Sequence, residues 1–67
     1  MSDLDNVYTY HKPSADQKER YQAIRAKGKE LAELIRGACP ASRERSLAFT
    51  KIEEAVMWAN ASIARNE

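Results

Sequence analysis

The side chains of this sequence best suited to chemistry are aromatic and basic residues in its first half. Tyr10 and His11 lie close to the start, and both rings can stack on a nucleobase. The segment from Lys18 to Lys29 carries five basic residues and one glutamate. Rings that stack on bases, combined with cations that bind phosphates, are what holding a nucleotide requires. This pattern favours nucleotide binding, but the same residues also fit a solvated helix face with tyrosines packed against it.

A second candidate for anion binding lies where another helix is expected to begin. Ser42 has the character of an N-cap, and Arg43 follows it directly. A cation is unfavourable in the first turn, because the helix N-terminus is already positive. Arg43 therefore suggests an anion that the arginine and the helix N-terminus hold together.

Groups for catalysis or metal binding do not come together in the expected fold. Cys39 belongs to the loop between two predicted helices and His11 to an N-terminal arm, so a Cys–His pair within one subunit is not expected. Glu53 and Glu54 are adjacent on a helix and point in different directions. One cysteine and one histidine do not supply the ligands of a structural zinc site. We therefore expect no enzymatic activity, no metal and no cofactor.

A first helix is predicted to position the basic segment. Ser14, followed by Gln17, matches a capping box and predicts where this helix begins. Gly37, followed by Pro40, predicts that it ends near Gly37. The interior Gly28 is explained by close approach of a second helix or by space left for a ligand. Spacings of three and four residues predict one apolar face, formed by Tyr21, Ile24, Gly28, Leu31 and Ile35.

A second helix is predicted from Ser42 to Arg65, antiparallel to the first because the loop between them is short. Its hairpin-facing residues are expected to be Ala48, Ile52, Ala55, Ala59 and Ser62. Larger apolar residues then lie outside this seam, where aromatic and methionine side chains favour contact with other subunits. The amide of Asn60 could fix the register of such a contact. The expected subunit interface contains Phe49, Val56, Met57, Trp58, Asn60 and Ile63.

The chain has 67 residues, enough for one small domain. We expect an all-α fold with an N-terminal arm over residues 1–13 and an antiparallel helical hairpin over residues 14–67. Because such a hairpin buries little surface and one cysteine forms no intrachain disulfide, we expect a homo-oligomer. The net charge of +1 argues against binding to a DNA or RNA polymer. Without a signal peptide or a long apolar run, the protein is expected to be cytoplasmic and not bound to a membrane.

Three segments of the sequence carry a resemblance to a known family. They are TYHKPS at residues 9–14, IRAKG at residues 24–28 and SRERSLAFTKIEEAVMWANASIAR at residues 42–65. Together they resemble the hairpin-domain family of phage anti-defence sponges, chiefly the anti-CBASS sponge, with the anti-Thoeris sponge related to it. The resemblance extends from about Tyr10 to Arg65, and the last segment is its most specific part.

The resemblance implies a non-enzymatic protein that sequesters cyclic oligonucleotide messengers such as cyclic GMP-AMP. It would thereby block CBASS immune signalling in the cytoplasm of the infected bacterium. Proteins of this family are helical hairpins that assemble into hexamers and do not cleave their ligands. They bind cyclic dinucleotides between two subunits, and some members bind cyclic trinucleotides at separate sites.

Position in the family pattern implies roles for individual residues of the dinucleotide site. Tyr10 is similar to the tyrosine that stacks on a base, and Arg25 stands where the family has a phosphate-binding lysine. Arginine keeps the charge but changes the geometry of the contact, so Lys27 could share the role. His11 and Gly28 belong to the same expected site.

The sequence also suggests residues for a trinucleotide site, and it leaves other functions open. Arg43, seven residues before Thr50, is similar to the arginine of the trinucleotide site, and both residues are assigned to it. A different function is a small helical oligomer that binds a host protein through Phe49, Met57 and Trp58. A weaker alternative is a DNA-binding protein that uses the basic face of the first helix.

Overall fold

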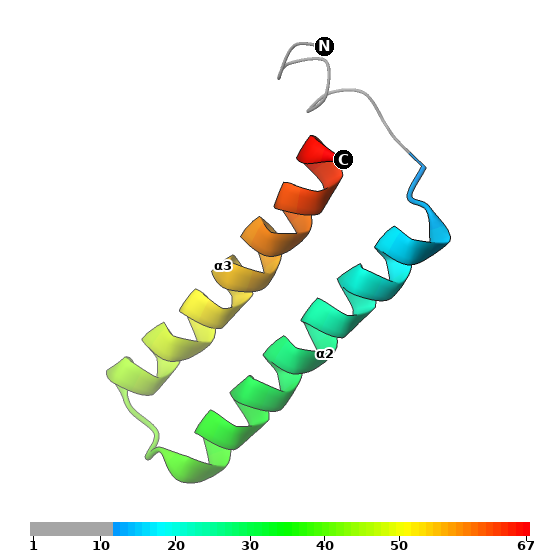
Figure 1. Cartoon of the computed structure of the whole chain (residues 1–67). Coiled ribbons are helices and arrows are strands. Elements are labelled where there is room, and N and C mark those ends of the chain that lie inside the picture. The colour runs from blue at the N-terminus through cyan, green and yellow to red at the C-terminus, as the bar shows by residue number, and fades with distance from the viewer. Residues whose placement is uncertain (1–11) are drawn as a thin grey trace.

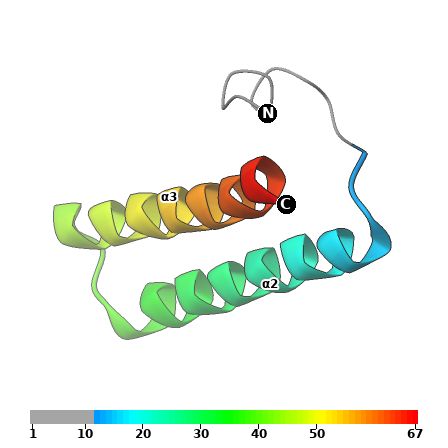
Figure 2. The same ribbon diagram turned by 45° about the horizontal axis from the view of Figure 1, so that its top comes forward.

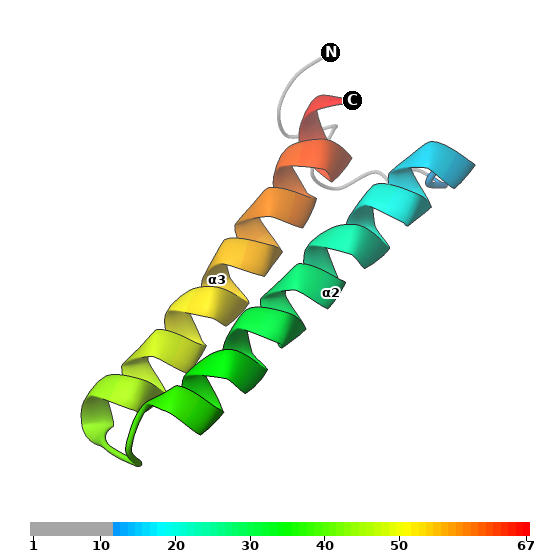
Figure 3. The same ribbon diagram turned by 60° about the horizontal axis from the view of Figure 1, so that its bottom comes forward.

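The computed structural model describes residues 12–67, and in this range the chain forms two α-helices and no strand. Helix α2 spans Ala15–Ala38 and helix α3 spans Arg43–Asn66. The helices lie side by side and run in opposite directions, joined by a short loop (Figures 1 and 2). Figure 3 shows the same pairing from a further angle. The predicted antiparallel helical hairpin is therefore confirmed for these residues.

Residues 1–11 lie outside the described range, and they include Tyr10 and His11 of the expected dinucleotide site. The arm predicted over residues 1–13, and the division of the chain at this point, therefore stay predictions. Lys12 and Pro13 are described and precede α2 without belonging to it.

Helix α2 begins where the capping pattern predicts. Ser14 is its N-cap, and the Ser14 Oγ accepts a hydrogen bond of 3.1 Å from the backbone N–H of Gln17. The Gln17 side chain accepts one of 3.0 Å from the backbone N–H of Ser14, which completes the capping box. Two backbone donors that a helix N-terminus leaves unpaired are thereby satisfied, and the start of α2 is fixed locally.

The end of α2 is set by Pro40 rather than by a left-handed Gly37. Gly37 lies inside the helix without a positive φ, and the helix continues to Ala38. Cys39 is the C-cap and is extended, with φ −116° and ψ 140°, because a residue before proline is disfavoured in the helical region. The Cys39 N–H still donates to the Ile35 carbonyl at 2.9 Å.

Arg45 ties the loop to both helices. The Ser42 Oγ accepts a hydrogen bond of 3.1 Å from the Arg45 N–H, so the predicted N-cap of α3 is confirmed. The Arg45 guanidinium then donates to the carbonyls of Arg36 and Cys39, each at 3.2 Å. These carbonyls lie at a helix end, where intrahelical donors run out. Nothing in the sequence analysis anticipated this role for Arg45.

The contact stripe of α2 differs from the prediction at one position. Leu31 was expected in the seam but is 47 % exposed, and Ala32 is half-buried instead. After Gly28, the next half-buried residue is four positions on, at Ala32, and the one after it is three positions on, at Ile35. A helix of 3.6 residues per turn does not keep the strict alternation of three and four residues that the prediction assumed. The half-buried residues of α2 are Gln17, Arg20, Tyr21, Ile24, Gly28, Ala32 and Ile35.

Gly28 is explained by close approach of the helices. A Cβ at this position would lie 2.7 Å from Cγ2 of Val56 and 3.7 Å from Cγ2 of Ile52. The first distance is shorter than van der Waals contact, so Val56 already occupies the space beside the glycine. Of the two explanations, packing against α3 is the one that the geometry supports.

The seam residues of α3 are partly those expected. Ala48, Ile52 and Ala59 are half-buried as predicted, whereas the expected seam residues Ala55 and Ser62 are exposed. Val56 was placed outside the seam, and this was wrong because Val56 packs against the backbone that Gly28 leaves uncovered. A larger residue on α3 thus faces the smallest residue on α2.

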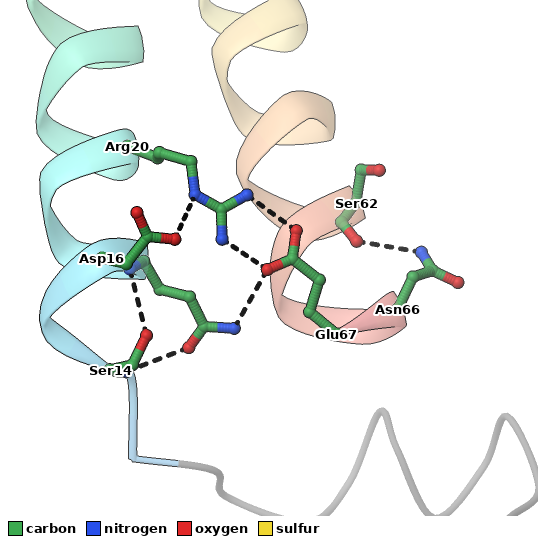
Figure 4. Close-up of polar contacts among 7 residues, drawn as sticks. Ser14, Asp16, Arg20, Ser62, Asn66 and Glu67 are labelled. Atoms are coloured by element: carbon green, nitrogen blue, oxygen red, sulfur yellow. Dashed lines mark hydrogen bonds and ion pairs between the residues drawn. The ribbon is translucent and has the colours of Figure 1, made fainter.

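A polar cluster joins the N-terminal end of α2 to the C-terminal end of α3, opposite the loop (Figure 4). Arg20 of α2 pairs with Asp16 through Nε at 3.0 Å and with Glu67 through Nη1 at 2.8 Å and through Nη2. Gln17 adds a long hydrogen bond of 3.4 Å to Glu67. The hydrogen bonds from Arg20 hold the pKa of the Glu67 carboxyl below its ordinary value, and the same bonds raise the pKa of Arg20. Beside it, Asn66 donates to the Ser62 carbonyl at 3.0 Å.

Among residues 12–67, none is fully buried. The apolar contact of the hairpin is a half-buried stripe, and several large apolar side chains remain on the surface, with Leu34 66 % and Trp58 58 % exposed. A small chain that buries so little surface by itself gains little from the hydrophobic effect. This observation agrees with the expectation of an oligomer but does not test it.

Candidate binding groove

A groove of about 950 Å³ runs along one side of the hairpin between α2 and α3. Its α2 wall carries charged side chains, and its floor is apolar and comes from both helices. Two residues of the expected dinucleotide site, Arg25 and Gly28, belong to it. The lining consists of Arg25, Gly28, Lys29, Ala32, Glu33, Arg36, Phe49, Ile52, Glu53, Val56 and Met57.

The α2 wall presents three cations in a row. Arg25, Lys29 and Arg36 recur at spacings of four and seven, so they lie along one edge of the helix beside the seam. Within residues 12–67, none of the three side chains lies within ion-pair distance of a carboxylate. Their N–H groups are therefore open to an anion from outside the hairpin, and two arginines offer the planar forks that suit a phosphate.

The α3 wall combines apolar side chains with one carboxylate. Phe49 and Met57 lie on this wall together with Glu53. The Arg45 guanidinium lies 5.7 Å from the Phe49 ring centroid, within the range of a cation–π contact. This contact stabilises the position of the Phe49 ring at the loop end of the groove. A flat ring entering the groove would therefore meet apolar surface on this side and cations on the other.

Lys27 does not share the wall with Arg25. Its Nζ lies 3.2 Å from Glu30 Oε2, and its side chain is 80 % exposed. Lys27 does not line the groove. Since residues two positions apart point to different sides of a helix, Arg25 and Lys27 diverge, and Arg25 is the better placed of the two.

Arg43 and Thr50 of the expected trinucleotide site lie away from this groove. Arg43 is the first residue of α3 and is exposed. Thr50 is also exposed, and its hydroxyl donates to the Ser46 carbonyl at 3.2 Å. Seven residues separate them, which is about 10 Å along the helix axis on one side. Neither residue lines the groove that contains Arg25 and Gly28.

The residues expected between subunits fall into two groups. Phe49, Val56, Asn60 and Ile63 are half-buried within one hairpin, whereas Met57 and Trp58 are 52 % and 58 % exposed. The amide oxygen of Asn60 has no hydrogen-bond partner in the described part of the chain. That oxygen is already enclosed by the hairpin's own atoms, so a neighbouring subunit does not reach it. Contact of these residues with another subunit stays a prediction.

Glu33, Arg36 and Glu53 line the groove, although the sequence predicted no site for any of them. The spacing of residues along a helix could have identified Arg36, since Arg25, Lys29 and Arg36 share one edge of α2. No comparable signal marks Glu53, because its position depends on how α3 is rotated against α2. The groove is a property of the pair of helices rather than of either one.

Other kinds of site have little support in this part of the chain. No cluster of three or more His, Cys, Asp or Glu side chains in residues 12–67 could hold a metal ion. The free thiol of Cys39 is exposed in the loop. Neither described helix is long and apolar enough to cross a membrane.

Comparison with known proteins gives one match. The family model described as "Acb2/Tad1, hairpin domain" matches residues 2–64. The matched range contains both helices nearly completely and every residue that lines the groove. Neither a curated protein nor a solved structure shows significant similarity to the chain.

Proposed function

Since the chain belongs to the Acb2/Tad1 hairpin-domain family, we propose that it binds cyclic di- and trinucleotide messengers and sequesters them without cleaving them. The family is one of ligand-sequestering sponges rather than of enzymes. The finer proposal is that cyclic dinucleotides such as cyclic GMP-AMP are the ligands and that their removal blocks CBASS signalling in the infected bacterial cytoplasm.

The observation that carries the proposal is a row of cations, which pair with no carboxylate among residues 12–67, beside an apolar floor. Arg25, Lys29 and Arg36 offer phosphate contacts along one wall, and Phe49 and Met57 offer apolar surface on the other. A cyclic dinucleotide has two phosphates and two flat bases, so it needs both kinds of surface at once. Because such a ligand is nearly two-fold symmetric, a pair of subunits related by a two-fold axis suits it, with one copy of Arg25 for each phosphate.

The arm completes the proposed dinucleotide site. Tyr10 is assigned to base stacking and His11 to the same pocket, on the family pattern quoted above. Gly28 lies on the groove floor, where its lack of a side chain brings α3 close. Arg43 and Thr50 are assigned to a separate trinucleotide site. Assembly into a hexamer is part of the same proposal.

Ligand release after heating tests the proposal directly. The full chain is incubated with a panel of cyclic di- and trinucleotides, separated from free ligand, heated and analysed for what it releases. We expect a cyclic nucleotide to be bound stoichiometrically and recovered intact. Recovery of a linear product would contradict sequestration without cleavage, and absence of binding at high micromolar concentration would contradict nucleotide binding altogether.

A second candidate function is supported by a different observation. Met57 and Trp58 are 52 % and 58 % exposed on α3, and Arg65 lies 6.0 Å from the Trp58 ring centroid. Exposed aromatic and methionine side chains are typical of protein interfaces. A helical module that binds a host protein through this surface is therefore the alternative. A stable protein partner recovered without any nucleotide would favour it.

A further inference from the structure

We infer that the groove selects guanine-bearing cyclic dinucleotides over adenine-bearing ones, with Glu53 reading the edge of the base. The inference rests on the proposed function, because it concerns the same ligand class and the same groove. It goes further by naming the base and the side chain that recognises it.

The groove holds carboxylates that the hairpin leaves unpaired. Glu53 lines it from α3 and Glu33 from α2. Among the residues that the structure describes, neither carboxylate accepts a hydrogen bond or forms an ion pair. Neighbouring Glu54 behaves differently, because it pairs with Lys51 at 3.6 Å and does not line the groove. A carboxylate weakens phosphate binding rather than contributing to it, so Glu53, on the wall opposite the cations, is available to contact another part of the ligand.

The two walls divide the ligand between them. Arg25, Lys29 and Arg36 stand on the α2 wall, so the phosphates are expected there. The base then lies towards α3, where Phe49 and Met57 supply apolar surface and Glu53 supplies the acceptor oxygens. Glu33 stands within the row of cations on the phosphate side. Glu53 is therefore assigned to the base and Glu33 is not.

A carboxylate distinguishes the bases by the pattern of donors on their Watson–Crick edges. Guanine presents N1–H and the 2-amino group side by side, and these two donors match the two oxygens of one carboxylate. Adenine presents an N1 lone pair beside a single amino donor, so a carboxylate meets repulsion at N1. Uracil presents one N–H between two carbonyl oxygens. Guanine is the base that satisfies Glu53 completely.

Replacing Glu53 by glutamine turns this argument into a test. A glutamine amide offers one acceptor and one donor, which pair with the amino group and N1 of adenine or with N1–H and O6 of guanine, so it no longer favours guanine. Calorimetry with the full chain measures the affinities for 3′,3′-cyclic di-GMP and 3′,3′-cyclic di-AMP. We expect the wild-type protein to prefer the guanine ligand at least about fivefold, and Glu53→Gln to abolish or reverse this preference.

Two control variants separate base recognition from simple electrostatics. Glu33→Gln removes the same charge from the same groove, so it should strengthen binding of both ligands and leave their ratio unchanged. Glu54→Gln removes a charge outside the groove and should change neither affinity appreciably. Equal wild-type affinities for the two ligands, or the same ratio in Glu53→Gln as in the wild type, would overturn the inference while leaving the sponge proposal intact. Absence of binding by either ligand would overturn the inference, whereas the sponge proposal falls only if every cyclic di- and trinucleotide of the panel also fails to bind.

Discussion

Arg25 belongs both to the sequence pattern of the family and to the lining of the groove. It occupies the position expected to contact phosphate, and it lines the α2 wall with Lys29 and Arg36. Lys27, which carries the same charge two residues away, instead pairs with Glu30 at 3.2 Å. A positive charge alone therefore does not identify a phosphate-binding residue on a helix. The side of the helix on which the residue lies must also face the groove.

Arg25→Ala is expected to weaken binding of a cyclic dinucleotide by about tenfold or more, because a hydrogen bond to a charged group contributes about 1.5–3 kcal/mol. Arg25→Lys keeps the charge but loses the fork, so its affinity should lie between those of the wild type and the alanine variant. Lys27→Ala is the matched control and should bind almost as the wild type does. Calorimetry measures all three, and an equal loss in Lys27→Ala would contradict the assignment.

At the scale of the helices, Gly28 sets how closely α2 and α3 approach. The space that a Cβ would need is occupied by Cγ2 of Val56 at 2.7 Å, and a β-branched side chain has little freedom to turn away. Gly37 lies in the same helix with nothing within 4 Å of an added Cβ. The two glycines therefore offer a matched pair for separating packing from helix propensity.

Gly28→Ala should destabilise the hairpin by about 1 kcal/mol or more, because overpacking costs about 1–3 kcal/mol and outweighs the gain in helix propensity. Gly37→Ala should instead stabilise it by about 0.5–1 kcal/mol, since it gains propensity without a clash. Chemical denaturation gives both free energies of unfolding. Stabilisation by both substitutions would show that α3 moves aside without cost.

The ends of the helices illustrate what sequence reasoning can and cannot reach. Ser14 with Gln17, and Ser42, are local signals, so the structure confirms the starts of both helices. Leu31 was misplaced because a strict alternation of three and four departs from 3.6 residues per turn. Val56 was misplaced because the seam of α3 depends on how one helix is rotated against the other, which no short pattern encodes. The groove residue Glu53 was missed for the same reason. Arg45 was missed because its partners are backbone carbonyls, which leave no trace in the residue pattern.

The ion pair between the helix ends predicts a dependence of stability on pH. Arg20 lowers the pKa of Glu67, so their pairing stabilises the folded hairpin above the ordinary pKa range of a glutamate. This stabilisation disappears as the pH falls through the lowered pKa and the carboxylate is protonated. Thermal unfolding of the wild type and of Glu67→Gln should therefore differ at neutral pH and converge in acid.

Glu30→Gln is the control for this titration. Glu30 pairs with Lys27 within one helix and joins no second element, so its removal should hardly change the unfolding temperature at any pH. If the difference between wild type and Glu67→Gln persisted unchanged in acid, the pairing of Glu67 with Arg20 would not be its cause.

For the molecule as a whole, the decisive feature is how little a single hairpin buries. With none of residues 12–67 fully buried, subunit contacts are the most direct source of additional stability, and the proposed hexamer would supply them. The surface around Met57 and Trp58 is the one assigned to that contact. Asn60, which is half-buried in the single hairpin, belongs to the same assignment.

Trp58→Glu should therefore reduce the mass of the assembly in analytical ultracentrifugation. It should also lower the unfolding temperature by at least about 5 °C, because losing even about 1 kcal/mol has this effect in a domain of this size. Ala26→Glu places the same side chain at an exposed position of α2 and should leave mass and stability unchanged. The wild-type unfolding temperature should rise with protein concentration, since folding and association are coupled. A monomer whose stability is independent of concentration would mean that the half-buried stripe between α2 and α3 is sufficient to hold the fold.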